Sequence, residues 1–155
     1  MPSNRREMMQ RGFAVASLLA AAGAWPARVL AQAGWNKTAF EAKSVADVMQ
    51  ALGVAKPAES KDVVLSAPDI AENGAVVPVA ASSALPGVKR ILFLVEKNPN
   101  TLAGWFDLSD AIEASVSTRI KMAETSRVYA VATTADNRVL FAQKQVKVTL
   151  GGCGG

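Results

Sequence analysis

The chain has 155 residues, of which 17 are basic, 13 are acidic and none is histidine, so its formal net charge at pH 7 is +4. It carries one cysteine, Cys153, and the lack of histidine excludes a Cys–His nucleophile and a zinc or copper site with imidazole ligands. One cysteine cannot close a metal site alone, so we expect no metal, no cofactor and no self-contained catalysis.

The first 33 residues have the parts of a bacterial export signal. Arg5 and Arg6 form a basic start, an uncharged run covers residues 12–26, and Ala31 and Ala33 form an A-x-A cleavage site. The run is too short and too rich in alanine to span a membrane, which takes about 20 residues. The paired arginines favour the twin-arginine route, although the residues after them depart from its usual motif. We therefore expect cleavage of this segment and a periplasmic mature protein.

Removal of the signal changes the charge of the chain. The signal holds four of the 17 basic residues and one of the 13 acidic residues, so the remaining 122 residues have a formal charge of +1. No cluster of lysine or arginine remains to indicate nucleic acid or a membrane surface as a partner of the mature form. A chain of this length forms one domain with one core.

Residues 34–62 are predicted to form an N-terminal helical segment. Ser44, three residues before Asp47, resembles a capping box, and Gly53 is a natural helix stop. Phe40 suggests an earlier turn on the same side. The i, i+3, i+4, i+7 spacing of one helix face is followed by Val45, Val48, Met49 and Leu52.

Residues 63–150 change to short strands separated by turn residues. About seven strands at regular spacing predict an immunoglobulin-like antiparallel β-sandwich. Pro78 marks its strand as an edge or bulged strand, residues 110–114 are expected as a helical turn, and Asp136-Asn137 is expected to close a hairpin. The predicted strands cover residues 63–66, 75–81, 88–95, 105–108, 116–122, 127–134 and 139–150.

The end of the last strand is expected to alternate between core and solvent. Val146, Val148 and Leu150 are predicted to point inward, and Lys147 and Thr149 outward. This alternation would anchor the C-terminal residues in a rigid sheet edge.

Residues 151–155 are predicted to be a flexible arm that carries the thiol of Cys153. Glycine costs more conformational entropy to order than any other residue, and three extended residues beyond Leu150 reach roughly 10 Å. A narrow enzyme channel would admit such an arm, because the glycines on either side of the cysteine have no side chains. The glycines that flank the cysteine are Gly151, Gly152, Gly154 and Gly155.

An unpaired cysteine in an exported protein indicates either a functional thiol or an intermolecular disulfide. We interpret Cys153 as a covalent attachment point for a substrate that partner enzymes modify. The alternative is an exported structural domain whose Cys153 links two chains. A redox enzyme is disfavoured because the chain has neither a histidine base nor a second, resolving cysteine.

Other candidate residues have simpler structural explanations. Asp107 and Asp110 could pair as carboxylates, but a polar turn is the simpler interpretation. Trp105, Phe106 and Tyr129 could form a ligand platform, but packing in the core accounts for them better.

Four stretches of sequence, together with the arm and the export signal, resemble one family. They are VKVTLGGCGG at 146–155, IAENGAVVPV at 70–79, EKNPN at 96–100 and STRIKMA at 117–123. They are similar to the SoxY family, the sulfur carriers of the periplasmic thiosulfate-oxidising Sox system, over nearly the whole chain.

The resemblance implies a heterodimer with a SoxZ-like subunit and the attachment of sulfur intermediates to Cys153. A cytochrome c enzyme would join thiosulfate oxidatively to the thiol, and a hydrolase would release the terminal sulfone as sulfate. The resemblance leaves open whether a molybdenum–haem dehydrogenase then oxidises the remaining sulfane sulfur. The carrier itself would catalyse none of these steps.

Overall fold

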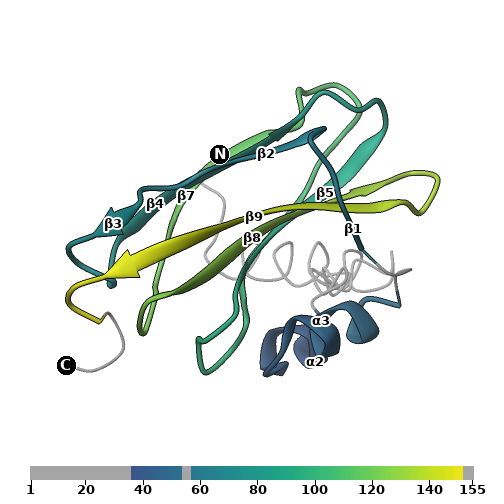
Figure 1. The fold of residues 1–155 in the computed structure, drawn as a ribbon. Helices are drawn as coiled ribbons and strands as arrows, with labels where there is room; N and C mark the ends of the chain where they lie inside the picture. Colours follow the sequence, from purple (N-terminus) through teal and green to yellow (C-terminus); the bar gives the residue numbers. More distant parts are fainter. Residues whose placement is uncertain (1–35, 54–56, 152–155) are drawn as a thin grey trace, which may run out of the picture. The chain divides into compact units, whose positions relative to one another are not determined.

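The computed structural model describes residues 36–53 and 57–151, so the predicted export signal and residues 152–155 lie outside the described residues. The described part is a β-sandwich with two short helices, which confirms the predicted mainly β fold class (Figure 1). The helices are α2 (Lys37–Glu41) and α3 (Val45–Ala51). The strands are β1 (Ala58–Glu59), β2 (Val63–Ser66), β3 (Ile70–Ala71), β4 (Val77–Ser83), β5 (Val88–Val95), β6 (Leu102–Asp107), β7 (Ser115–Ile120), β8 (Ser126–Thr134) and β9 (Val139–Val148).

The strands form two sheets that pack face to face. The larger sheet has the order β1-β9-β8-β5-β6, and β3 pairs with the second half of β9. The smaller sheet has the order β2-β4-β7 and is antiparallel throughout. The two-residue strands β1 and β3 are parallel to β9 and cover its outer edge, which limits edge-to-edge association.

The larger sheet is buried on both faces. On β5, Ile91, Phe93 and Val95 belong to the core between the two sheets. Leu92 and Leu94 alternate with them and pack in a second cluster with the helices, whose buried residues include Val48 and Met49. Two buried faces explain why residues 91–95 form an uninterrupted apolar run.

The helix α3 begins and ends where the sequence predicts. The Ser44 hydroxyl accepts a hydrogen bond from the Asp47 amide at 3.1 Å, and Gly53 follows the helix with a φ of 62°. Phe40 lies in the preceding helix α2. The side chain of Asn36 caps α2 and donates to the Ala51 carbonyl at 2.9 Å, which ties the two helices together.

Most strands match the prediction, with differences at their ends. The strands β2 and β5 have the predicted bounds, and β8 and β9 form the predicted hairpin, with Asn137 at a φ of 61° in its turn. By contrast, β4 starts two residues later than expected and β6 three residues earlier. The strand β4 is delayed because the Asn73 side chain accepts from the Ala75 amide at 2.8 Å and holds that segment as a turn.

Two local predictions need correction. Residues 110–114 form a turn and bend without a helix. Leu150 was expected in the core, but it is 65% exposed, because β9 ends at Val148 and Leu150 lies past the last core residues.

The pairing of β4 explains why Pro78 is tolerated inside this strand. The strand β4 is central, yet β2 pairs only with residues 80–83 of it. Pro78 pairs with Arg119 of β7 on one side only, so it occupies a local edge where its missing amide hydrogen costs no ladder bond.

Candidate functional site

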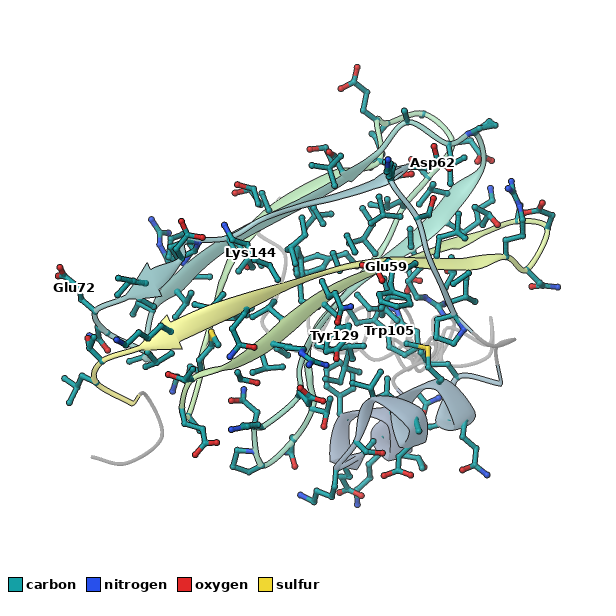
Figure 2. The ribbon with its side chains drawn as sticks, viewed as in Figure 1. Glu59, Asp62, Glu72, Trp105, Tyr129 and Lys144 are labelled. Atoms are coloured by element: carbon teal, nitrogen blue, oxygen red, sulfur yellow. The ribbon has the colours of Figure 1, made fainter. Side chains whose placement is uncertain are left out.

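The last described residues of the chain, 149–151, are called the arm root below. Thr149 continues the pairing of β9 with β3, since its amide donates to the Ala71 carbonyl at 3.1 Å. Its hydroxyl donates to the Glu72 carbonyl at 2.9 Å. The Leu150 carbonyl then accepts from the Gly74 amide at 2.7 Å. The arm root is therefore hydrogen-bonded to the 71–74 segment at successive positions, and Figure 2 shows Glu72 at this end of the molecule.

A turn after β3 connects the arm root to the β7–β8 loop. Gly74 donates its amide to Leu150, and its carbonyl accepts from the Met122 amide at 2.7 Å. Met122 is fully buried in the core between the sheets. The position of the arm root is thus coupled through one peptide segment to the packed core.

Gly151 lies against the backbone of the β7–β8 loop. A Cβ atom built on Gly151 would collide with the carbonyl oxygen of Ala123. Backbone atoms cannot move aside as a flexible side chain can, so a close approach selects glycine here. The first glycine of the predicted arm therefore has a steric role in addition to any role in flexibility.

Asn98 holds the loop that Gly151 contacts. Its side-chain oxygen accepts from the Ala123 amide at 2.9 Å, and its side-chain nitrogen donates to the Lys121 carbonyl at 2.7 Å. The amide of Asn98 itself donates to the Val95 carbonyl at 3.3 Å, at the end of β5. These bonds fix the loop relative to the central strands.

Thr125 closes the same loop onto β9. Its hydroxyl oxygen accepts from the Val148 amide at 3.0 Å and donates to the Val148 carbonyl at 3.4 Å. Lys97 and Glu124 form an ion pair at 3.1 Å on the surface nearby. The three sequence stretches 70–79, 96–100 and 117–123 thus supply residues to one end of the sandwich, around the arm root.

The structure places one predicted site residue and leaves the others out. Gly151 is described at the arm root, whereas Cys153 and Gly152, Gly154 and Gly155 lie outside the described residues. No pattern of residue types or spacing assigned Asn98 or Ala123 to the site. The resemblance to the SoxY family singled out the stretches that hold Gly74, Asn98 and Ala123, without revealing that they meet at the arm root.

The weaker candidate residues have structural roles. Asp107 pairs with Arg90 at 2.7 Å and Asp110 pairs with Lys89 at 2.6 Å, so the two carboxylates are held apart by separate cations. Trp105 donates to Asp107 at 2.9 Å and carries the Arg90 guanidinium 4.0 Å above its ring.

The aromatic residues that could have formed a ligand platform are divided between the two cores. Trp105 and Tyr129 belong to the cluster between the larger sheet and the helices (Figure 2), whereas Phe106 packs on the core between the two sheets. They therefore do not form one surface.

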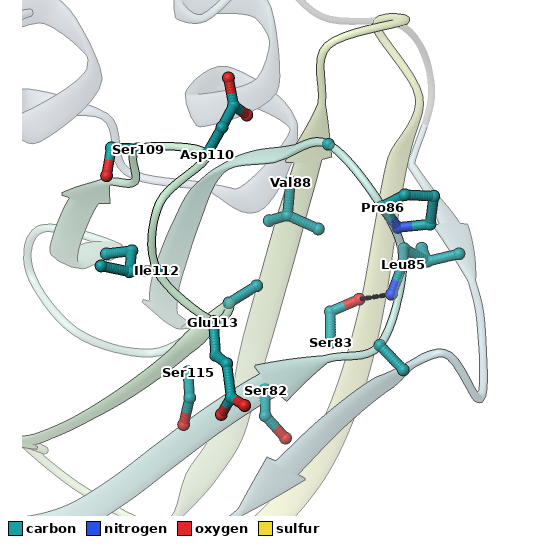
Figure 3. Close-up of a pocket in the computed structure, with 13 residues that line it drawn as sticks. Ser82, Ser83, Leu85, Pro86, Val88, Ser109, Asp110, Ile112, Glu113 and Ser115 are labelled. Atoms are coloured by element: carbon teal, nitrogen blue, oxygen red, sulfur yellow. Dashed lines mark hydrogen bonds between the residues drawn. The ribbon is translucent and has the colours of Figure 1, made fainter.

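An open depression of about 650 Å³ lies at the other end of the sandwich (Figure 3). It begins at Ser82 and Ser83, where β4 ends, whereas the arm root contacts the segment that precedes β4. Two of its polar side chains are engaged within the protein: Ser83 accepts from the Leu85 amide at 3.3 Å, and Asp110 is paired with Lys89. This depression is separate from the arm root.

Two further findings concern only residues 36–53 and 57–151. In this part of the chain no helix is long and apolar enough to cross a membrane. Nor does it contain a group of three or more histidine, cysteine, aspartate or glutamate side chains arranged to hold a metal ion.

Comparison with known families identifies the chain. The family described as "Sulfur oxidation protein SoxY" matches residues 48–153, which is more than half of the chain and includes Cys153. The chain belongs to the SoxY family. The match begins within α3, covers the whole sandwich and ends on the single cysteine.

One solved structure supports this membership, and a second shares the fold. The sulfur carrier protein SoxY from Chlorobium limicola f thiosulfatophilum is 31% identical, with a TM-score of 0.59, over 66% of this chain and 93% of that chain. A superoxide reductase (neelaredoxin) from Ignicoccus hospitalis is 16% identical, with a TM-score of 0.50, over 56% of this chain and 78% of its own. The second likeness shows the sandwich fold alone. Among curated proteins, none matches the chain.

Proposed function

We propose that this SoxY-family protein is a periplasmic sulfur carrier whose Cys153 thiol holds thiosulfate-derived intermediates. The observation that carries the proposal is the family match, which extends to Cys153 itself. The solved relative is named a sulfur carrier protein, and 93% of its chain is covered. The arm root adds support, because a rigid base with a short glycine-rich extension suits the presentation of a thiol to other proteins.

The loading step forms one disulfide bond. The sulfur of Cys153 bonds to the sulfane sulfur of thiosulfate, the thiol proton is released to solvent, and two electrons pass to a cytochrome c enzyme. A hydrolase then adds water across the bond between the sulfane sulfur and the terminal sulfone, so that sulfate leaves with release of one proton and the sulfane sulfur takes up the other. The sulfane sulfur stays on Cys153 as a persulfide until further oxidation and a second hydrolysis free the thiol.

The chain leaves the chemistry of these steps to its partners. Three amides near the arm root are already engaged, since those of Gly74, Met122 and Ala123 donate to groups within the protein. They are therefore not available to bind an anionic sulfur group as an oxyanion hole would. The role of the protein is to present the thiol.

The partners that we propose are those implied by membership of the SoxY family. A SoxZ-like subunit would form a stable heterodimer with the sandwich, and the oxidising and hydrolysing enzymes would bind transiently. Export through the twin-arginine route would carry the folded heterodimer across the membrane with the signal of this chain alone, at Arg5 and Arg6.

The proposal is tested by replacing the thiol in the source cell. Cys153→Ser should abolish thiosulfate oxidation by intact cells, because the attachment atom is lost. Gly155→Ala is the matched control, since it changes the arm and keeps the sulfur. Thiosulfate consumption at the parent rate in the Cys153→Ser strain would contradict the carrier function.

A further inference from the structure

Cys153 lies a short distance from the folded body of the protein. Three residues separate it from Leu150, so its Cα lies at most roughly 10 Å from that of Leu150. An enzyme that encloses the sulfur must therefore bring the rim of its active-site channel onto the surface around the arm root. The shortness of the arm makes this contact unavoidable.

The surface that such an enzyme meets carries exposed apolar side chains: besides Ile70 of β3, which is 57% exposed, they are Leu150 and Val76. Leu150 is 65% exposed and Val76 is 53% exposed. They are linked through Gly74, which donates to the Leu150 carbonyl at 2.7 Å and lies two residues before Val76. The Val76 amide donates to the Asn73 carbonyl at 3.3 Å, so the turn that presents this side chain is itself hydrogen-bonded.

The charges around the arm root do not favour a partner whose surface is mainly positive or mainly negative. Lys97 and Glu124 neutralise each other in an ion pair at 3.1 Å. Glu72 and Lys121, both exposed, have opposite charges. Apolar contacts at the centre of an interface contribute more binding energy than scattered charges at its margin.

We propose that Leu150 and Val76 form the docking contact for the enzymes that act on Cys153, and that the apolar rim of the enzyme's channel packs on them. The inference rests on the carrier function proposed above. The contact is small and suits a transient complex, which must release the carrier after each step. Leu150 therefore has a role that its exposed position would not otherwise explain.

Two other exposed apolar residues provide matched controls at the opposite end of the sandwich. Ile112 is 57% exposed and lines the open depression. Val64 is 56% exposed and pairs with Ser82, which lines the same depression. Ile112→Asp thus matches Leu150→Asp, and Val64→Asp matches Val76→Asp, in exposure and in chemical change.

The experiment uses the mature protein as the complex purified from its source cell. Each variant is incubated with thiosulfate and the native periplasmic fraction, and the mass added at Cys153 is followed over time. We expect loading at least tenfold slower for Leu150→Asp and Val76→Asp, and loading at the parent rate for Ile112→Asp and Val64→Asp. Alkylation of Cys153 by iodoacetamide, which needs no docking, should proceed at one rate in all of them.

Equal loading of all the variants would overturn the docking contact. So would loss of the partner subunit from Leu150→Asp or Val76→Asp during purification, because the surface would then belong to the heterodimer interface. Slowed alkylation in the same variants would overturn it too, since the arm itself would have changed. A parent chain that is never loaded would instead overturn the proposed function, and the docking contact with it.

Discussion

Gly151 and Ala123 define where the arm leaves the folded domain. The Cα of Gly151 lies so close to the Ala123 carbonyl that any side chain would meet backbone atoms. Ala123 cannot shift freely, because Asn98 and the core residue Met122 hold its loop. The direction in which the arm starts is therefore set by packing at this glycine.

We predict that Gly151→Ala destabilises the arm root. The added methyl group must displace the loop or break the hydrogen bond between Leu150 and Gly74, at a cost of about 1–2 kcal/mol. Chemical denaturation would measure the free energy of unfolding, with Gly154→Ala as the control that should leave it unchanged. An unaltered stability in Gly151→Ala would show that the close approach is not maintained in solution.

The flexible arm stays a prediction, whereas the prediction for the residues at its base was partly wrong. Alternation along β9 correctly places Val146 in the core, and the same rule fails for Leu150, which is 65% exposed. Periodicity describes the direction of side chains within a strand and does not show where the opposing sheet ends. The contact of Gly151 with Ala123 was also beyond prediction, because it joins segments that only the fold brings together.

The strand β9 leads from the larger sheet directly into the arm root. It pairs with β8 along its length and with β1 and β3 on its other edge. Long strands of alternating sequence are predictable from their periodicity, as β8 and β9 were. The two-residue strands β1 and β3 were not, because so short a segment carries no periodic signal and is defined only by its partner.

We predict that β7 tolerates a charge on its outer face and not on its inner face. Ile120 is 4% exposed in the core between the sheets, where an unpaired carboxylate in Ile120→Asp should cost roughly 3 kcal/mol or more. The neighbouring Arg119 is exposed, so Arg119→Asp should change stability little. Thermal unfolding of both variants would compare the two faces, and equal melting temperatures would contradict the assignment of Ile120 to the core.

At the scale of the whole molecule, the two ends of the sandwich differ in role. One end gathers the arm root, the turn at Gly74 and the loop held by Asn98, while the other end holds the open depression that begins where β4 ends. The sequence stretches that resemble the SoxY family meet at the first end. The fold class and the family were thus predictable from sequence, whereas the convergence of these stretches was not.

We predict that the export signal serves two chains. Deletion of residues 1–33 should leave both this protein and its SoxZ-like partner in the cytoplasm, because the partner would be exported only when docked. Cell fractionation with antibodies to each subunit would measure this, and a signal change at Arg5 and Arg6 to lysine should act in the same way. A partner that still reached the periplasm alone would contradict joint export.

The central claim is that Cys153 carries sulfur intermediates, and one measurement tests it most directly. The protein would be isolated from the periplasm of its source cell, grown on thiosulfate, without reductant, and its intact mass measured before and after reduction. The carrier function predicts added sulfur-containing masses on Cys153 that disappear on reduction. Only bare thiol or a disulfide-linked dimer of this chain would contradict it and favour the structural cross-link.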